Sequence, residues 1–566
     1  MRSIIEFFVC LLIAVTIFRT FEAEGYVIES GSMGPGLLGH YKRFECPSCG
    51  YVSEVLADHA PGPRRARCAN CGASGIAVDD RLRSDGDQLL VHRRLFEFRP
   101  PQRWEVVVFR NPNKLTEAYV KRVVGLPGEE VHLREGDIFI NGTRQAKSLL
   151  RQRGSRVLVF DNDFRPPPDD PDWESRWLAD SGDFGWQPQG GDFVLDTGRG
   201  DNAKSSTSVS WVSYRHWIRR GGSHRTSVHV AEWPTKFEPP RVDAASRLTW
   251  NDNTQTLICY GALAAAERDR WLKAAPSGDA GDAFRQAITK LYRASHIAPI
   301  NDEVAYNPPD AATRENLVRD LMLAMELSIA SGSGQFAVEM NDGVATAHVI
   351  LDFEKREARL LIGNDATSLR KAALPAHVRP GGSPVLIEVS QMDRQSLLAI
   401  DGRVVFEPFR YDGDRGRWTV DKGPRSEVRG QATATNDFQS TIHDPRSTTD
   451  DLPPVPRRAV RFGVRGLSVR VSQLRLFRDV FYTHEPHQLA CDQSFQLGAD
   501  EYFVLGDNSS ISRDSRGWPA SRMLTGRMLL GKPFIVHLPS RRERISLAGR
   551  QTEVRIPEFS RIRYIR

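Results

Sequence analysis

Apolar and polar residues alternate one by one along most of this 566-residue chain, and this period of two is what most constrains its fold. The alternation recurs in stretches such as "EVVVF", "HVILDF" and "LSVRVSQLRLF", with turn residues between them. Asn141-Gly142 and Asp401-Gly402 lie between apolar runs, as the turns of β-hairpins do. Only residues 262–295 have the clear period of a helix. We therefore predict a mainly β fold.

Breaks in composition divide the chain into parts. Its length predicts about three or four domains. Residues 163–173 are rich in Pro and Asp and read as a linker, and residues 421–457 hold few apolar residues and read as a long loop or disordered insert. Between these breaks, residues 317–482 alternate for long stretches, with one face formed by Leu321, Leu323, Met325, Leu327 and Ile329. This pattern is typical of a β-sandwich.

The N-terminus carries the chain's long apolar run, residues 4–18, broken only by Glu6 and Thr16. We expect it to be an uncleaved transmembrane helix that "FRTF" extends through the interface. A cleaved signal peptide is the alternative, but the following "TFEAEG" offers only Ala23 for a small-x-small cleavage site. Later residues offer no second run long and apolar enough to span a bilayer. The sequence thus predicts a single membrane anchor.

The C-terminal residues 541–566 contain eight arginines. Two interpretations stay open for them: a solvated tail, or contact with the anionic headgroups of a lipid bilayer. Neither stacking aromatic residues nor a nucleic-acid-binding motif accompanies the basic residues. We therefore expect no nucleic-acid partner.

Candidate catalytic residues begin with Ser30 and Ser32, which flank Gly31 in "VIESGSMGPG". A serine hydroxyl is a poor nucleophile until a base takes its proton, and no histidine lies in an obvious triad setting. Lys121, in "EAYVKRVVGLPGEEV", is a candidate base. On a strand it shares a face with Tyr119 and Val123, and this apolar setting would move the pKa of its amine from about 10.4 toward neutrality.

A third stretch, "FVLGDNSSISRDSRGW", takes a strand into a turn dense with Ser, Asp and Arg. Ser512 is placed to orient the lysine amine. Asp514 and Arg516 are spaced to form a bidentate pair that makes the site rigid.

These three stretches and "GDQLLVHRRLFEFRPPQRWEVVVFRNP" resemble, in order, the sequence boxes of bacterial type I signal peptidases. The resemblance implies a Ser/Lys protease with Ser32 as nucleophile and Lys121 as general base. It implies that Ser30 and the Ser32 N–H bind the oxyanion, that Ser512 bonds the lysine amine, and that Asp514 and Arg516 support the site.

The resemblance also implies the biology of the family. Catalysis would need no cofactor, and the substrates would be signal peptides of exported preproteins, cut after small-x-small motifs. The protein would be a single-pass protein of the cytoplasmic (inner) membrane, with its catalytic domain on the extracytoplasmic side. The sequence departs from the family pattern at Glu29, Gly36 and "GDNSSIS", which bear on loop packing and substrate range rather than on the matched serine and lysine.

Two C-x-x-C motifs, "CPSCG" and "CANCG", lie between the first two boxes. Their cysteines, Cys46, Cys49, Cys68 and Cys71, have the spacing of a Cys₄ zinc ribbon, so we expect a structural zinc ion. Disulfides are the rival interpretation, because an extracytoplasmic domain meets oxidising conditions. Whether Cys259 and Cys491 pair stays open.

These inferences predict a mainly β protein with an N-terminal transmembrane helix, a β-rich catalytic core, an inserted Cys₄ zinc ribbon and an inserted jelly-roll-like β-sandwich. The expected division is a membrane anchor at 1–22, catalytic core at 23–45, 76–150 and 485–550, zinc ribbon at 46–75, linker and partly helical insertion at 151–310, lectin-like sandwich at 311–484 and basic tail at 551–566.

The inserted sandwich weakly resembles concanavalin and laminin-G-like domains, and either glycan or peptide binding or mere packing on the core would explain it. Two other functions are alternatives to a signal peptidase. One is a catalytically degenerate membrane-anchored binding protein, which intact Ser32 and Lys121 disfavour. The other is a self-cleaving Ser/Lys repressor of the LexA type, which the anchor and the lack of a DNA-binding motif disfavour.

Overall fold

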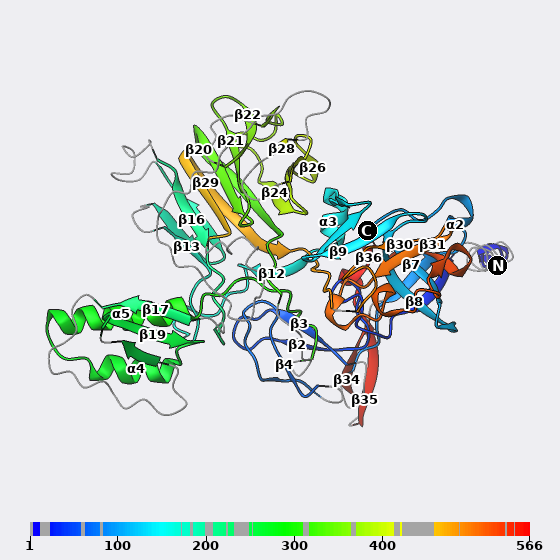
Figure 1. The fold of residues 1–566 in the computed structure, drawn as a ribbon, viewed down its shortest axis with the longest axis horizontal. Coiled ribbons are helices and arrows are strands. Elements are labelled where there is room, and N and C mark those ends of the chain that lie inside the picture. The colour runs from blue at the N-terminus through cyan, green and yellow to red at the C-terminus, as the bar shows by residue number, and fades with distance from the viewer. Residues whose placement is uncertain are drawn as a thin grey trace.

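The fold is mainly β, as predicted: in a computed structural model of the chain, 45% of the described residues lie in strands and 13% in helices (Figure 1). The structure describes residues 4–11, 23–57, 63–79, 83–170, 172–180, 185–197, 208–221, 225–230, 248–251, 253–308, 316–363, 369–412, 419–420, 458–485, 487–537, 540–547 and 550–565.

A sheet built from both ends of the chain forms the part that holds the candidate site. Its strand order is β1-β6-β33-β7-β8-β31-β32, with β36 paired to β33. The strands are β1 Ala23–Val27, β6 Gln88–His92, β7 Val106–Asn111, β8 Lys114–Gly125, β31 Glu501–Leu505, β32 Leu524–Thr525, β33 Leu529–Val536 and β36 Arg563–Tyr564. Since β8 pairs with β31 across an intervening 375 residues, the insertion leaves from one side of this sheet and returns to it.

The exit and return of the insertion are joined by a second, four-stranded sheet of order β11-β10-β9-β30. Its members are β9 Glu130–Arg134, β10 Asp137–Ile140, β11 Thr143–Arg144 and β30 Phe495–Gln496. Asn141 and Gly142 both have positive φ, 49° and 75°, and connect β10 to β11 as the predicted hairpin turn. A short helix, α3 Leu149–Ser155, then leads into the insertion.

The largest sheet among the described residues is in the insertion, and two long strands, β20 Leu321–Asn341 and β29 Val460–Arg478, pair along its middle. Breaks in register at three points bend the pair. The face predicted from alternation, Leu321 to Ile329 in steps of two, is buried. β20 also pairs with β21 Thr346–Asp352 and β24 Val385–Met392. The sheet continues beyond them through β22 Glu357–Ile362, β23 Arg370–Ala373, β25 Gln395–Ile400, β26 Arg403–Val404, β27 Phe409–Asp412 and β28 Thr419–Val420.

This sheet extends beyond the range expected for the sandwich, into the segment expected to be a linker. Its additional strands are β12 Val157–Asp161, β13 Trp177–Ala179, β14 Trp186–Gln189, β15 Asp192–Leu195 and β16 Ser210–Tyr214. Because β20 occupies only one edge of β29, the other edge still presents backbone hydrogen-bonding groups, and β12, β15 and β16 pair with it in turn. The short, widely spaced apolar runs of these strands gave no sandwich pattern.

The predicted helices are α4 Ala265–Ala274 and α5 Asp279–Ser295. Phe284, Ile288 and Leu291 lie on the buried face of α5, at the spacing of an amphipathic helix. The helices share one hydrophobic cluster with a three-stranded sheet, β17 Arg225–His229, β19 Thr256–Tyr260 and β18 Leu248–Asn251. Figure 1 shows this unit at the far side of the insertion from the catalytic-core sheet.

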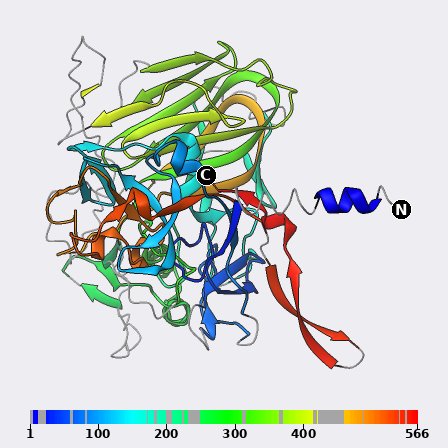
Figure 2. The same cartoon turned by 90° about the vertical axis from the view of Figure 1, so that its right-hand side faces the viewer.

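One interpretation of the C-terminal residues, a solvated tail, is wrong for some of their arginines, which pair with the core. Strand β36 adds to the core sheet beside β33, and Arg563 donates to Asp87 Oδ2 at 2.8 Å. Arg561 faces the same carboxylate. Before β36, β34 Ser540–Leu547 and β35 Arg550–Pro557 form a two-stranded hairpin that projects from the body (Figure 2).

At the N-terminus, residues 4–11 form a helix with exposed side chains, and the rest of the expected anchor, residues 12–22, lies outside the described residues. Within the part of the chain that the structure describes, no helix is both long and apolar enough to cross a membrane.

A buried ion pair fixes the returning strand β31 to β8. The Arg122 guanidinium donates to both carboxylate oxygens of Asp507, at 2.8 and 2.6 Å, and its remaining groups donate to the carbonyls of Trp104 and Gly154. Only 2% of the Arg122 side chain and 7% of the Asp507 side chain are exposed. The pair therefore joins the strand that carries Lys121 to the loop after β31.

Arg122→Leu should lower stability sharply, because it leaves the buried Asp507 carboxylate without its partner, a loss of about 3–5 kcal/mol. The measurement is the melting temperature of the full chain, followed by circular dichroism. Lys114→Met, which breaks an exposed pair with Glu117 on the same strand, is the matched control and should leave the melting temperature unchanged. Equal effects of the two changes would contradict the role given to the Arg122–Asp507 pair.

Candidate active site

Ser32 and Lys121, 89 residues apart in sequence, meet where the loop around Ser32 packs against strand β8 of the core sheet. Lys121 Nζ lies 2.6 Å from Ser32 Oγ and 3.2 Å from the carbonyl oxygen of Val120. Lys121 is on β8, and its Nζ lies 5.2 Å from the centre of the Tyr119 ring, the neighbour expected on the same face of the strand. The strand and its facing residues are as the alternation predicted.

Burial determines the charge of the Lys121 amine. Only 3% of Lys121 is exposed, and this loss of water lowers its pKa from 10.5 to about 8. The carboxylates of Asp514 and Asp507 act in the opposite direction and raise the pKa, while the Arg516 guanidinium lowers it. A substantial fraction of the amine is therefore neutral near physiological pH and able to accept a proton from Ser32.

The loop around Ser32, residues 28–40, is held as a tight turn. Gly34 N–H donates to the Gly31 carbonyl at 3.0 Å, and Leu37 N–H donates to the Met33 carbonyl at 2.9 Å. Met33 and Leu37 are buried in a cluster with core-sheet residues, so the loop packs on the sheet beside β8. Ser30 is exposed, and its Oγ lies 3.3 Å from Ser32 Oγ.

The turn after β31 lies against this loop with no space between them. A Cβ atom on Gly506 would come 2.4 Å from the Ser32 carbonyl oxygen and 2.2 Å from Ser512 Oγ. The position therefore requires glycine, because any side chain would push the backbone of Ser32 away.

Asp514 and Arg516 form the expected bidentate pair, with Nε to Oδ1 and Nη2 to Oδ2 both at 2.8 Å. Burial raises the pKa of Asp514, but the adjacent Arg516 guanidinium outweighs it and holds the pKa below its usual value. Asp514 also accepts from Gly506 N–H at 3.0 Å. Arg516 in turn donates to Thr483 and Ser509, so the pair fixes the turn from both sides.

Ser512 lies in this turn, but the hydrogen bond to the lysine amine that the resemblance implies is not formed. The Ser512 Oγ is buried, and its side chain interacts with the Asp514 carboxylate, whose pKa it helps to lower. Ser512 Oγ and the Ser32 carbonyl oxygen both lie close to Gly506, within 2.4 Å of where a Cβ atom on that residue would be.

Asn508 is a site residue that the sequence reasoning did not single out. Its backbone N–H donates to the Ser32 carbonyl at 3.0 Å, and its side-chain Nδ2 donates to the Gly31 carbonyl at 3.0 Å. Its side chain also exchanges hydrogen bonds with Asn307, from the insertion. The Gly-Asp-Asn turn was recognised in the sequence, but only the folded chain brings it against the serine loop.

The four cysteines of the C-x-x-C motifs come together beside this site. The ribbon consists of two hairpins, β2 Tyr41–Glu45 with β3 Val52–Leu56 and β4 Arg65–Ala66 with β5 Ile76–Ala77. Cys46 Sγ lies 3.7 Å from Cys71 Sγ, and Cys49 Sγ lies 3.6 Å from Cys68 Sγ. Four sulfurs at about 2.3 Å from one zinc ion would be about 3.8 Å apart, whereas a disulfide requires about 2.05 Å. The donor set and spacing fit zinc.

Cys259 and Cys491 lie in two different hydrophobic clusters, and no disulfide joins them.

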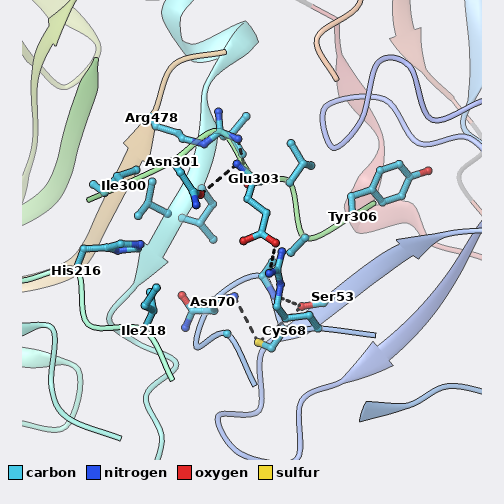
Figure 3. Close-up of a pocket in the computed structure, with 18 of the residues that line it drawn as sticks. Ser53, Cys68, Asn70, His216, Ile218, Ile300, Asn301, Glu303, Tyr306 and Arg478 are labelled. Carbon is cyan, nitrogen blue, oxygen red and sulfur yellow. Dashed lines mark hydrogen bonds and ion pairs between the residues drawn. The ribbon is translucent and has the colours of Figure 1, made fainter. Parts of the chain in front are cut away.

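A cavity of about 190 Å³ lies between the ribbon, the segment 299–306 and the end of β29. Figure 3 shows Glu303 in this cavity between Arg478, at the end of β29, and the ribbon residues Ser53 and Cys68. Glu303 pairs with Arg67 of the ribbon. Pro35 of the serine loop also lines the cavity. The cavity between ribbon and insertion is therefore adjacent to the loop that carries Ser32.

A model of the family described as signal peptidase, peptidase S26, matches residues 69–202. The chain carries a signal peptidase S26 domain. The matched residues include Lys121 but not Ser32 or the turn after β31, which were recognised from their own motifs.

Curated relatives agree with this signal peptidase domain. A signal peptidase I of Rickettsia felis is 25% identical over 150 residues, which cover 24% of this chain and 55% of that protein. A signal peptidase I of Leptolyngbya laminosa is 42% identical over 64 residues, 10% of this chain and 31% of that protein. The chain thus spans about half the length, or less, of these relatives. The resemblance recognised in the sequence is confirmed.

Among solved structures, the chain is similar to a carbohydrate-binding module of Bacillus subtilis, with 8% identity and a TM-score of 0.16 over 28% of this chain and 74% of that one. A galectin of Caenorhabditis elegans is 11% identical with a TM-score of 0.17, over 32% of this chain and 90% of that one. Neither likeness bears on the function of the signal peptidase domain or of the insertion.

Lys121 should titrate near pH 8, and Asp514→Asn should lower its pKa further, because it removes a carboxylate that favours the charged amine. The measurement is NMR of the full chain with ¹³C-labelled lysine, with the Lys121→Met spectrum assigning the signal. Lys114, exposed on the same strand and paired with Glu117, provides an internal reference that titrates above its ordinary value. A Lys121 signal that titrates above 10 would contradict the effect of burial described here.

Proposed function

We propose that this protein is a membrane-anchored serine endopeptidase that cleaves signal peptides from exported preproteins by a Ser/Lys dyad. The observation that carries the proposal is the 2.6 Å contact between Ser32 Oγ and a buried Lys121 amine. A hydroxyl beside a neutral amine is the minimal apparatus of this nucleophilic chemistry.

In the first step, the neutral Lys121 Nζ takes the Ser32 Oγ proton as Oγ attacks the carbonyl carbon of the scissile peptide. The negative charge that develops on the carbonyl oxygen would be stabilised by the Ser32 N–H and the exposed Ser30 hydroxyl, whose Oγ is 3.3 Å from Ser32 Oγ. The Lys121 ammonium then gives its proton to the leaving nitrogen as the C–N bond breaks. This leaves an ester on Ser32, which water hydrolyses with Lys121 again as base.

The proposed substrates are signal peptides with small residues on either side of one variable position before the cleaved bond. The relatives named signal peptidase I support this substrate class. The apolar run at residues 4–18 supports a single membrane anchor. The likeness to signal peptidases I supports placing this anchor in the cytoplasmic membrane, with the catalytic core on the extracytoplasmic side. No cofactor takes part in the proposed chemistry.

We infer that Cys46, Cys49, Cys68 and Cys71 hold one structural zinc ion. Thiolate ligands in a closed tetrahedral site supply folding energy rather than chemistry. The ribbon contacts the serine loop through Leu56, which packs with Leu38 and Tyr41, so the ion would stiffen the support of Ser32.

Ser32→Ala and Lys121→Met should each reduce cleavage of a model preprotein by at least about 1,000-fold, because each removes one member of the dyad. The assay follows the mature product by gel electrophoresis with the full chain in detergent or vesicles. Ser331→Ala, on an exposed part of the insertion, and Lys114→Met, on the exposed end of β8, are matched controls and should retain full activity. If Lys121→Met kept near-normal activity, a different group would be the base; if the unmodified protein cut no preprotein, a binding protein would be favoured.

The purified full chain should contain about one zinc ion, and Cys68→Ser with Cys71→Ser should abolish it and lower the melting temperature. The measurement is elemental analysis, with Cys259→Ser, a buried cysteine outside the ribbon, as control. Absence of zinc together with four oxidised ribbon thiols would overturn the assignment in favour of disulfides.

A further inference from the structure

A segment of the insertion, residues 302–307, lies against the serine loop and the turn after β31. Tyr306 packs on the serine loop so closely that a Cβ atom on Gly34 would come 2.4 Å from its ring. The Tyr306 carbonyl accepts from Leu56 N–H of the ribbon at 2.7 Å. At its other end, the segment is held by Arg478, which donates to the carbonyls of Asp302 and Glu303 at 2.9 and 3.2 Å. The long strand β29 thus fixes this segment in place.

Asn307, at the end of the segment, pairs with Asn508 through both side-chain amides. Asn508 Nδ2 donates to Asn307 Oδ1 at 2.6 Å, and Asn307 Nδ2 donates to Asn508 Oδ1 at 3.1 Å. Both side chains are buried. An amide nitrogen has two protons, and the second Nδ2 proton of Asn508 goes to the Gly31 carbonyl at 3.0 Å. Asn307 therefore fixes the orientation of the Asn508 side-chain amide. This orientation determines whether Asn508 Nδ2 can donate a hydrogen bond to the Gly31 carbonyl.

The Gly31 carbonyl and the Ser32 N–H belong to the same peptide unit. Because that unit is planar and trans, its C=O and N–H point in opposite directions, and holding one fixes the other. The Ser32 carbonyl is held as well, by Asn508 N–H at 3.0 Å. The peptide units on both sides of the Ser32 Cα are thus fixed by one residue, whose side chain is oriented by Asn307.

We propose that Asn307 is a positioning residue for the reaction: it orients Asn508, which aims the Ser32 N–H at the oxyanion of the transition state. This inference rests on the proposed function. It makes the insertion part of the catalytic apparatus rather than an appended module, because a residue 275 positions beyond Ser32 completes the support of its backbone.

Asn307→Ala should lower kcat for preprotein cleavage by about 10- to 100-fold, less than the loss from deleting an oxyanion donor, because the donor is misaligned rather than removed. KM should stay within about twofold. The midpoint of the pH–rate profile should not move, because Asn307 is uncharged and does not contact Lys121. A general structural defect would instead change kcat, KM and the pH midpoint together. Asn341→Ala, which removes a similar turn contact to Gly343 N–H within the insertion, is the matched control and should match the unchanged protein.

A double-variant comparison tests the route of the effect. Asn508→Ala should itself lower kcat, and adding Asn307→Ala should lower it less than about twofold further, because the proposed effect of Asn307 runs through Asn508. The other side-chain contact of Asn307 in this turn, to Ser510 Oγ, is longer, at 3.4 Å. Independent, multiplying losses would overturn the proposal, as would an Asn307→Ala variant with kcat within twofold of the unchanged protein.

If Asn307→Ala lowers the melting temperature by more than a few degrees, Asn307→Ser becomes the test. Its shorter hydroxyl cannot reach Asn508 but leaves room for a water molecule, so it should keep the fold and still lose kcat; full kcat in this variant overturns the proposal. Failure of the unchanged protein to cleave any preprotein would instead refute the proposed function. Normal cleavage with an unimpaired Asn307→Ala variant would refute only this inference.

Discussion

The exclusion of water from the Lys121 amine is the constraint on which the rest of the site depends. A lysine in water is charged at neutral pH and cannot take a proton, whereas burial beside Tyr119 brings its pKa to about 8. The surrounding buried charges are paired with each other: Asp514 with Arg516, and Asp507 with Arg122. Each pair is nearly neutral overall. Charged residues can therefore surround the site while neither carboxylate forms an ion pair with the Lys121 amine.

Segments from widely separated parts of the chain support the serine loop. The turn after β31 contributes Asn508 and requires Gly506 where the backbones touch. The ribbon contributes Leu56, and the insertion contributes Tyr306. From the C-terminus, Arg563 donates to the Gly36 carbonyl at 2.6 Å and to Asp87, which in turn accepts from Leu38 N–H. The loop's own backbone hydrogen bonds form its turns, and these neighbours fix its position on the core sheet.

Much of the fold and part of the site could be predicted from the sequence, because the relevant signals are local. Alternation predicted that Lys121 and Tyr119 share one face of β8, and the C-x-x-C spacing predicted that four cysteines cluster. The structure shows both. Asp514 and Arg516 are two residues apart, so their pairing is also local.

Features that depend on long-range packing could not be predicted in this way. The pairing of Asn307 with Asn508 joins residues 201 apart that carry no common pattern. The strands β12, β15 and β16 were missed because their apolar runs are short and widely spaced, and only long-range pairing with β29 makes them part of the sheet. The Ser512 hydroxyl, which the resemblance places in a hydrogen bond to Lys121, instead interacts with Asp514. Each of these features depends on contacts between segments far apart in the sequence.

The most direct measurement of the central claim is the rate at which Ser32 is acylated by a peptide ester, followed across pH by mass spectrometry of the digested protein. The account predicts an acyl group on the peptide containing Ser32, formed at a rate that rises with a single ionisation near pH 8 and lost in Lys121→Met. An acyl group on another residue, or a Ser32 acylation rate that does not change between pH 6 and 10, would contradict it.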